Sequence, residues 1–182
     1  MTFEKTVTLK DGRNCLLRNG VTSDGKAVLD VFNRTHEETD YLLTYSDENR
    51  FTASQEADFL QSKTDSANTV EIIAIVDGVV AGTAGIDALG LRDKIKHRAV
   101  FGIAITKEFW GLGIGKYLME ACIECAREAG YLQLELEVVA ENERAVEMYR
   151  RAGFIEYGRN PKAFRLRTGE YQELIEMRLE LK

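Results

Sequence analysis

The chain of 182 residues is 45% hydrophobic, carries a formal net charge of −6 and has a pI near 5.1. This length supports one sizeable core and is short for two ordinary domains, so we expect a single domain over residues 1–182. An acidic chain without clustered Lys and Arg argues against nucleic acid as a partner. The first residues lack the apolar segment of a signal peptide, and the longest apolar runs are too short to span a membrane. We therefore expect a cytoplasmic protein with no membrane partner.

The three cysteines are few and odd in number, which fits a reducing compartment. Cys122 and Cys125 are three residues apart in a helical pattern, a spacing that also suits a redox pair or half of a metal site. Only His36 and His97 are available as further soft ligands, and the sequence has no second Cys/His pair. We therefore expect these cysteines to be buried core residues and no metal to be bound.

Two hairpins are predicted in the first half of the chain. Asp11-Gly12 lies between strand-like runs at residues 6–10 and 14–18, and this dipeptide favours a tight turn. Asp77-Gly78 separates the apolar runs 70–76 and 79–88 in the same way, and it gives the clearest hairpin in the sequence.

Two helices are predicted between these hairpins. Ser23 or Asp24 can cap the first helix, which runs to about Glu38. Thr52 followed by Gln55 is a capping-box pattern, and it opens a second helix that runs to about Lys63.

The second half alternates strands with helices. The strand-like run 100–105 leads into a glycine-rich segment and a helical pattern, and the run 131–139 leads into a helix that begins at Asn142 and stops at Gly153. Two late strands follow at 154–166 and 170–181, and the only proline, Pro161, suits an edge or a bulge in the first of them. With no linker or repeat, this order indicates one α+β domain.

Gly111, Gly113 and Gly115 stand where the strand 100–105 gives way to a helix. Glycine lets the backbone bend tightly and approach a ligand, and the first turn of a helix has unpaired N–H groups and the positive end of the dipole. The spacing matches neither the dinucleotide fingerprint G-x-G-x-x-G nor the P-loop. The segment therefore predicts a short loop that holds phosphate at a helix N-terminus. The alternative is a glycine-rich helix start that binds no ligand.

Two segments resemble the GCN5-related N-acetyltransferase (GNAT) superfamily. Ile105 to Gly115 is similar to its acetyl-CoA motif V-x-x-x-x-R/Q-G-x-G-x-G/A, and Asn142 to Phe154 is similar to its later pattern N-x-x-A-x-x-x-Y-x-x-x-G-F. The resemblance covers roughly residues 70–181. It implies a single GNAT-fold domain, with a mixed, mostly antiparallel sheet of about seven strands, about four flanking helices, and two central parallel strands that splay apart.

The resemblance also implies acetyl-CoA as the cofactor. Backbone N–H groups near Ile103 and Ile105 would contact pantetheine and the thioester. The phosphates would reach the loop, and Asn142 and Tyr149 would also contact the cofactor. The loop residues concerned are Trp110, Gly111, Leu112, Gly113, Ile114 and Gly115. Trp110 departs from the Arg or Gln of many members, which removes one auxiliary contact and leaves the backbone donors.

Acyl transfer to an amine needs a base for the amine and an acid for the departing thiolate. By resemblance Tyr149 is the acid. The alternative role for Tyr149 is that of an aromatic side chain packed in the core, and the alternative role for Asn142 is that of a helix N-cap alone. Glu137 is the first choice of base, because Leu136-Glu137-Val138 resembles the L-E-V of bacterial ribosomal-protein N-terminal acetyltransferases. The other interpretation is an ordinary strand with one polar face, since Gln133, Glu135 and Glu137 alternate with leucines.

Four further residues are candidates for binding the acceptor. Glu37, Glu38 and Asp40 fall in the segment that lines the acceptor pocket in this family, and a solvated helix end is the alternative. His97 has the intrinsic pKa of a base and is otherwise a surface histidine. The expected activity is acetyl transfer from acetyl-CoA to a primary amine in a ternary complex, with a small amine, a protein N-terminus or a lysine as acceptor and a homodimer possible. A non-catalytic acyl-CoA-binding regulatory domain is the alternative.

Overall fold

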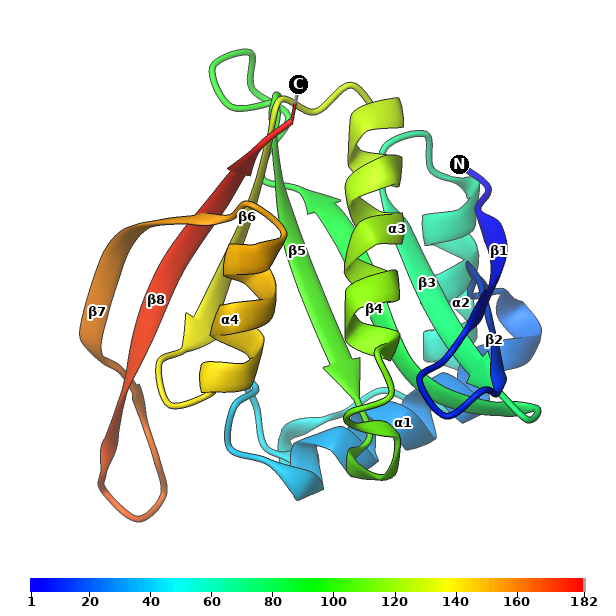
Figure 1. Cartoon of the computed structure of the whole chain (residues 1–182), viewed down its shortest axis with the longest axis horizontal. Coiled ribbons are helices and arrows are strands. Elements are labelled where there is room, and N and C mark those ends of the chain that lie inside the picture. The colour runs from blue at the N-terminus through cyan, green and yellow to red at the C-terminus, as the bar shows by residue number, and fades with distance from the viewer. Residues whose placement is uncertain (182) are drawn as a thin grey trace.

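A computed structural model describes residues 1–181, and it joins all their strands in one sheet of order β1-β2-β3-β4-β5-β6-β8-β7 (Figure 1). Within that part of the chain β5 and β6 are the only parallel neighbours. The expectation of a mixed, mostly antiparallel sheet is confirmed, with eight strands where about seven were expected. The strands are β1 (Glu4–Thr8), β2 (Asn14–Asn19), β3 (Val70–Val76), β4 (Val79–Ala88), β5 (Arg98–Ile105), β6 (Gln133–Val139), β7 (Ile155–Arg165) and β8 (Tyr171–Glu180).

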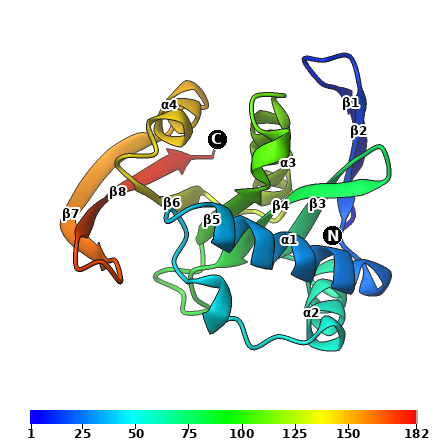
Figure 2. The ribbon, with the colours of Figure 1, turned by 90° about the horizontal axis from the view of Figure 1, so that it is seen from below.

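Four α-helices cover the two faces of this sheet, with α1 and α2 on one face and α3 and α4 on the other (Figure 2). Val28, Leu60 and Ile73 belong to the smaller core beneath α1 and α2, and the larger core lies beneath α3 and α4. No helix among the described residues is long and apolar enough to cross a membrane. The helices are α1 (Gly25–Glu38), α2 (Ala53–Asp65), α3 (Ile114–Glu128) and α4 (Glu143–Arg151), and short 3₁₀ turns cover Thr22–Asp24, Ser46–Glu48 and Lys107–Phe109.

The start of α1 differs from the expected side-chain cap. Asp24 occupies the N-cap position, but its side chain makes no capping hydrogen bond to the helix. The carboxylate instead pairs with Arg18, at 2.6 Å, and accepts from the Val21 N–H at 2.9 Å. The Asp24 carboxylate oxygens therefore bind the Arg18 guanidinium and the Val21 N–H, and they are not available to the N–H groups of the first turn of the helix. The predicted capping box of Thr52 and Gln55 is present at the start of α2.

The two central parallel strands pair only at their beginnings. Their register runs from Arg98 opposite Gln133 to Val100 opposite Glu135 and then stops, although both strands continue. Figure 1 shows β5 and β6 diverging from this point, with α3 and α4 standing on either side of the opening. The expected splay is confirmed, and it leaves one edge of β5 from Phe101 to Ile105 without a strand partner.

The late strands and the cysteines lie as the sequence predicts. β7 is the outermost strand, and its register shifts between Asn160 and Phe164, the interval that contains Pro161. Cys122 and Cys125 are buried and free, and burial raises the pKa of both thiols, that of Cys125 to about 12. Protonated, buried thiols are poor nucleophiles and poor metal ligands, so these two act as core residues.

Candidate functional site

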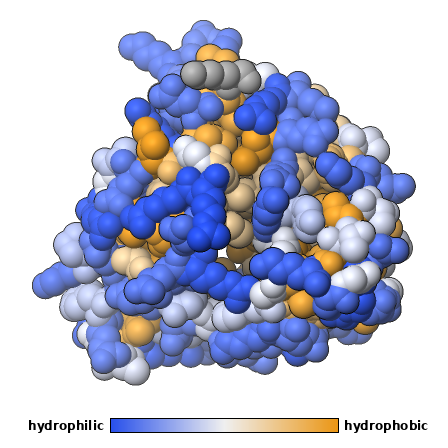
Figure 3. All heavy atoms as spheres, viewed as in Figure 1, coloured by the Kyte–Doolittle hydropathy of each residue, from blue (hydrophilic) through white to orange (hydrophobic). Residues whose placement is uncertain are grey.

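A cavity of about 920 Å³ occupies the opening between β5 and β6. Its walls come from the ends of β5 and β6, the glycine loop, α3 and α4. The first hairpin, the end of α1 with the segment that follows it, and the β7–β8 hairpin complete them. Figure 3 shows apolar atoms between the hydrophilic side chains that α3 and α4 direct outward, where the surface is hollowed. The cavity therefore joins segments from both halves of the chain.

The unpaired edge of β5 presents its backbone to this cavity. The Thr106 N–H donates to the Ala81 carbonyl on the β4 side, and the ladder alternates from there, so Ile105 and Ile103 point their N–H and C=O groups to the other edge. The Trp110 indole N–H confirms this direction, since it donates to the Ile105 carbonyl at 2.6 Å. Two main-chain N–H groups are thus available to an extended ligand lying along β5.

The glycine loop turns sharply at two left-handed positions, Gly111 with φ +88° and Gly113 with φ +97°. Gly113 is the N-cap of α3, so the N–H groups of the first turn point outward into the cavity. A side chain at Gly115 would come within 3.1 Å of the Met148 sulfur, so this glycine allows α3 and α4 to approach closely. These donors and the helix dipole make an anion site.

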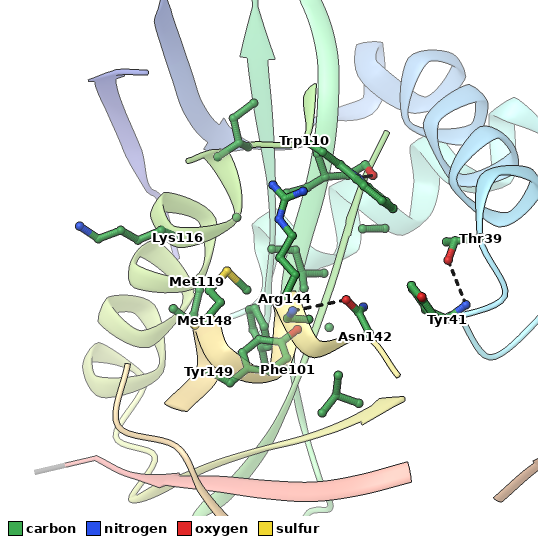
Figure 4. A pocket seen from close by; sticks show the side chains of 18 of the residues that line it. Thr39, Tyr41, Phe101, Trp110, Lys116, Met119, Asn142, Arg144, Met148 and Tyr149 are labelled. Atoms are coloured by element: carbon green, nitrogen blue, oxygen red, sulfur yellow. Dashed lines mark hydrogen bonds between the residues drawn. The ribbon is translucent and has the colours of Figure 1, made fainter. Parts of the chain in front are cut away.

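Trp110 and Arg144 meet across the mouth of the cavity. The Arg144 guanidinium, from the first turn of α4, lies 5.7 Å from the centre of the Trp110 ring (Figure 4). The Lys107 ammonium lies 5.8 Å from the same ring centre. Because the indole is also fixed to the Ile105 carbonyl, the ring holds these cations beside the glycine loop. Trp110 thus supplies positive charge indirectly, through its neighbours.

Asn142 and Tyr149 both line the cavity from α4 and its N-terminus. Asn142 caps the helix, with its Oδ1 accepting from the Ala145 N–H at 3.3 Å. Tyr149 is 5% exposed and packs edge-on against Phe101, with ring centroids 6.2 Å apart. No described residue hydrogen-bonds its hydroxyl, and burial raises its pKa, so the phenol stays protonated at neutral pH.

Glu137 lies on β6 at the cavity, on the face of the sheet that carries α1 and α2. Its neighbours Leu136 and Val138 belong to the larger core, so alternation sends the carboxylate to the opposite face. Glu135 on the same face is buried and paired with Arg98. Glu137 is exposed and has no ion-pair partner among the described residues, so its carboxylate is free to meet a ligand.

The four acceptor candidates do not gather at this cavity. Glu38 accepts from the Lys107 N–H at 2.6 Å and from Arg34 at 3.0 Å, so its carboxylate fastens the end of α1 to the loop after β5. Glu37 is exposed and lines neither hollow, and Asp40 lines a second hollow of about 160 Å³. His97 precedes β5 at the strand end opposite to Ile105 and is absent from the cavity lining.

Two of the loop residues help to fix the loop in place. The Leu112 carbonyl accepts from the Lys10 N–H at 3.1 Å, which ties the loop to the first hairpin, and Ile114 is buried in the core. Sequence reasoning missed several lining residues because they come from distant segments with no motif: Lys10, Tyr41, Leu42, Leu43, Phe164 and Leu174. Arg144 lies inside the Asn142 motif, two residues after Asn142. A positive charge in the first turn of the helix that this motif opens was the signal that could have identified it as a lining residue.

Known proteins share this sequence pattern and this fold. The profile of the acetyltransferase (GNAT) family matches residues 28–154, most of the chain. The chain belongs to this family. Among curated relatives, L-amino acid N-acetyltransferase AaaT of Escherichia coli is 32% identical over 108 residues, which are 59% of this chain and 65% of that protein. The aligned part is thus just under two thirds of that relative's length.

Solved GNAT structures have the same fold. An acetyltransferase of the GNAT family from Streptococcus pneumoniae superposes with a TM-score of 0.87 at 28% identity, covering 91% of this chain and 99% of that one. A putative acetyltransferase from Salmonella typhimurium, solved with its cofactor acetyl-CoA, gives a TM-score of 0.82 at 17% identity and covers 93% and 95% of the two chains. The second similarity concerns the fold alone.

Proposed function

We propose that the protein transfers an acetyl group from acetyl-CoA to a primary amine by direct attack in a ternary complex. The observation that carries this proposal is the Tyr149 hydroxyl, protonated, without a partner in the described chain, and facing the cavity between the splayed strands. Its position is supported by the packing against Phe101. Cofactor binding alone requires no acid at this place, which argues against a non-catalytic acyl-CoA-binding regulatory domain.

The cofactor is acetyl-CoA in this proposal. The protein offers hydrogen-bond donors to each part of the cofactor, from the pyrophosphate to the thioester. The first-turn N–H groups of α3 would take the pyrophosphate, with Lys10 and Arg144 adding positive charge at the same end of the cavity. The N–H groups of Ile103 and Ile105 would pair with pantetheine and polarise the thioester carbonyl. Asn142 would contact the cofactor from the start of α4.

Glu137 would serve as the general base for the acceptor. A lysine-like amine is almost wholly protonated at neutral pH, so attack requires that a proton be removed. The carboxylate takes this proton directly or through a water, the amine nitrogen bonds to the carbonyl carbon, and the C–S bond breaks. The electron pair leaves on sulfur, which takes the Tyr149 proton. The nitrogen releases its second proton to solvent and Tyr149 regains a proton from solvent, so the products are an N-acetyl amine and CoA.

Glu37, Glu38, Asp40 and His97 take no role in this scheme, because the main cavity is built without them. The buried, free cysteines fit a reducing compartment such as the cytoplasm.

The experiment that tests the function has two readouts. CoA and acetyl-CoA should raise the melting temperature by mass action, and a panel of amines should release free thiol from acetyl-CoA in an amine-dependent reaction. The relative from Escherichia coli is named for L-amino acids, so that panel includes them. A melting shift without turnover of any amine would favour the regulatory-domain alternative, and the absence of both would end the cofactor assignment.

A further inference from the structure

The charged residues divide the large cavity into two unlike ends. The cations lie at the end formed by the first hairpin, α3 and α4, where Lys10, Lys116, Arg144 and Arg151 line the wall together with one carboxylate, Glu120. The other end is formed by the segment after α1 and by the strands β6, β7 and β8. Figure 4 shows Tyr41 and Thr39 on this side, away from Lys116.

The second end is apolar with a single carboxylate. Its wall comprises Tyr41, Leu42, Leu43, Phe164 and Leu174, and Glu137 is the one charged side chain among the described residues that line it. Leu174 is 6% exposed, whereas Leu43 is 79% exposed and forms the rim. A ligand that places its amine at Glu137 therefore rests its body on hydrocarbon.

This arrangement is unfavourable for an acceptor with a second charge next to its amine. The carboxylate of a free amino acid lies one carbon from the amino group, so it would be brought close to the like charge of Glu137 and meet no cation on this wall. A second ammonium would likewise rest against leucine and phenylalanine side chains. Charge discrimination of this kind weakens the wrong ligand more than apolar contacts strengthen the right one.

A cation near this end lies outside the main cavity. Arg165 lines the smaller hollow of about 160 Å³, together with Asp40, and neither residue lines the main cavity. The two hollows share Thr39, Leu42, Leu43 and Phe164. A charged group would have to extend past these apolar walls before it met Arg165.

The apolar wall is held in place by one residue of the β7–β8 turn. The Arg167 N–H donates to the Tyr45 hydroxyl at 3.0 Å, and its guanidinium lies 4.0 Å from the Tyr45 ring centre and 2.7 Å from an oxygen of Asp47. These contacts fasten the segment after α1 to the hairpin that carries Phe164. The wall is thus arranged before any acceptor binds, which favours selection by shape and polarity.

We propose that the acceptor is a primary amine on an apolar body whose group next to the amine is uncharged. Both an alkyl or arylalkyl amine and an amide-linked N-terminus with an apolar first residue have this chemistry. Arg167 is a positioning residue for this acceptor, since it acts through Tyr45 and Asp47. The inference rests on the proposed function, because it takes Glu137 as the place of the reacting amine.

The test compares acceptors that share a body and differ in charge. Leucine, leucinamide, 3-methylbutylamine, 1,4-diaminobutane and a tetrapeptide with N-terminal leucine are each assayed for kcat/KM with acetyl-CoA. We expect 3-methylbutylamine to exceed both leucine and 1,4-diaminobutane by about 100-fold, within the range by which enzyme pockets separate close analogues. Since its amine is more basic than that of leucine, such a preference cannot come from a larger free-amine fraction. Comparison of leucinamide with the tetrapeptide separates a small-molecule source from a polypeptide source.

Two variants test the wall itself. Leu43→Arg adds a cation at an exposed rim position that tolerates a long side chain, and it should raise kcat/KM for leucine relative to 3-methylbutylamine. Arg167→Ala should raise KM for 3-methylbutylamine about tenfold with little change in kcat. Arg127→Ala, on the last turn of α3, is the matched control and should change neither value.

The outcomes separate this inference from the proposed function. A preference of the parent protein for leucine or 1,4-diaminobutane overturns the apolar-acceptor inference and leaves acetyl transfer intact. Unchanged selectivity in Leu43→Arg and an unchanged KM in Arg167→Ala also overturn it. Acetylation of none of the five compounds overturns both, and the CoA melting shift then shows whether the cofactor site survives.

Discussion

Glu137 on β6 lies directly opposite Glu176 on β8 in the antiparallel register. Both side chains point to the face of the sheet that the larger core does not cover. Like charges in directly opposed positions destabilise a sheet, so this pair costs stability that one neutral partner would restore. Of the two, Glu137 lines the main cavity, and a cationic amine placed there would relieve the repulsion.

We predict that Glu137→Gln makes the protein more stable and less active. Removal of one charge from the pair should raise the free energy of unfolding by about 0.2–1 kcal/mol. The value of kcat/KM should fall at neutral pH and recover in part as the pH approaches the pKa of the amine, where free amine no longer depends on a base. Urea unfolding and a pH–rate profile measure the two effects.

Glu176→Gln is the matched control for this prediction. It removes the same repulsion from the other side, so it should give a similar gain in stability and keep the parent's pH–rate profile. A Glu137→Gln protein with the parent's profile would remove the base assignment, and equal losses of activity in both variants would point to a shared electrostatic effect.

A second prediction concerns the leaving group. Tyr149→Phe keeps the ring against Phe101 and removes a hydroxyl that no described residue bonds, so stability and acetyl-CoA affinity should stay near those of the parent. Turnover should fall by about 10² or more, the usual contribution of a general acid. Isothermal titration and thiol release measure these quantities, and full turnover would return Tyr149 to a packing role.

A third prediction separates charge from strain in the glycine loop. Any side chain at Gly113 is strained at φ +97°, yet a Cβ there meets no atom closer than 3.8 Å. Gly113→Ala should therefore cost about 1–2 kcal/mol of stability and retain some CoA binding. Gly113→Glu adds a negative charge at the helix N-terminus and should abolish the CoA melting shift. Equal shifts in the two variants would contradict a phosphate site at this loop.

A fourth prediction concerns the contact between Trp110 and Arg144. If the ring holds the guanidinium for the cofactor, Trp110→Ala and Arg144→Ala should each weaken CoA binding, and the double variant should be little weaker than either. Trp110→Phe keeps a ring beneath the guanidinium and loses only the bond to the Ile105 carbonyl, so its loss should be smaller. Additive losses, measured by titration at one fixed salt concentration, would show that the two residues act separately.

The last prediction is a pH dependence of stability away from the cavity. Burial raises the pKa of Glu71 from 4.5 to about 7, against the opposing effects of a hydrogen bond from Thr83 and the charge of Lys63, while Asp87 and Glu56 add to the rise. Because the folded protein holds this proton more tightly than the unfolded chain, stability falls as the pH rises from about 4.5 to 7.

Glu71→Gln removes this titration. The variant should be more stable than the parent at pH 8, and the difference should vanish near pH 4.5, as urea unfolding at the two pH values would show. Glu124→Gln, an exposed change on α3, is the control. A constant difference across this range would assign the effect to packing.

The sequence by itself determined the local elements and both family motifs. Apolar alternation and turn chemistry around Asp11-Gly12 and Asp77-Gly78 act over a few residues, so the hairpins could be predicted. The spacing of Asn142 and Tyr149 is likewise a local property, because two helical turns set both residues on one side of α4. Local patterns could not show that the Asp24 carboxylate would turn to Arg18, since that partner lies on another element.

Only the tertiary structure decided which candidates meet at the cavity. In the sequence, Glu38 and Glu137 both look like ordinary surface carboxylates. In the structure, Glu38 accepts a hydrogen bond from the Lys107 backbone, whereas Glu137 faces the cavity. The apolar wall joins Leu43 to Phe164, and its clamp joins Tyr45 to Arg167. Such contacts depend on the packing of the whole sheet and on the divergence of β5 from β6, and no pattern within a short segment encodes them.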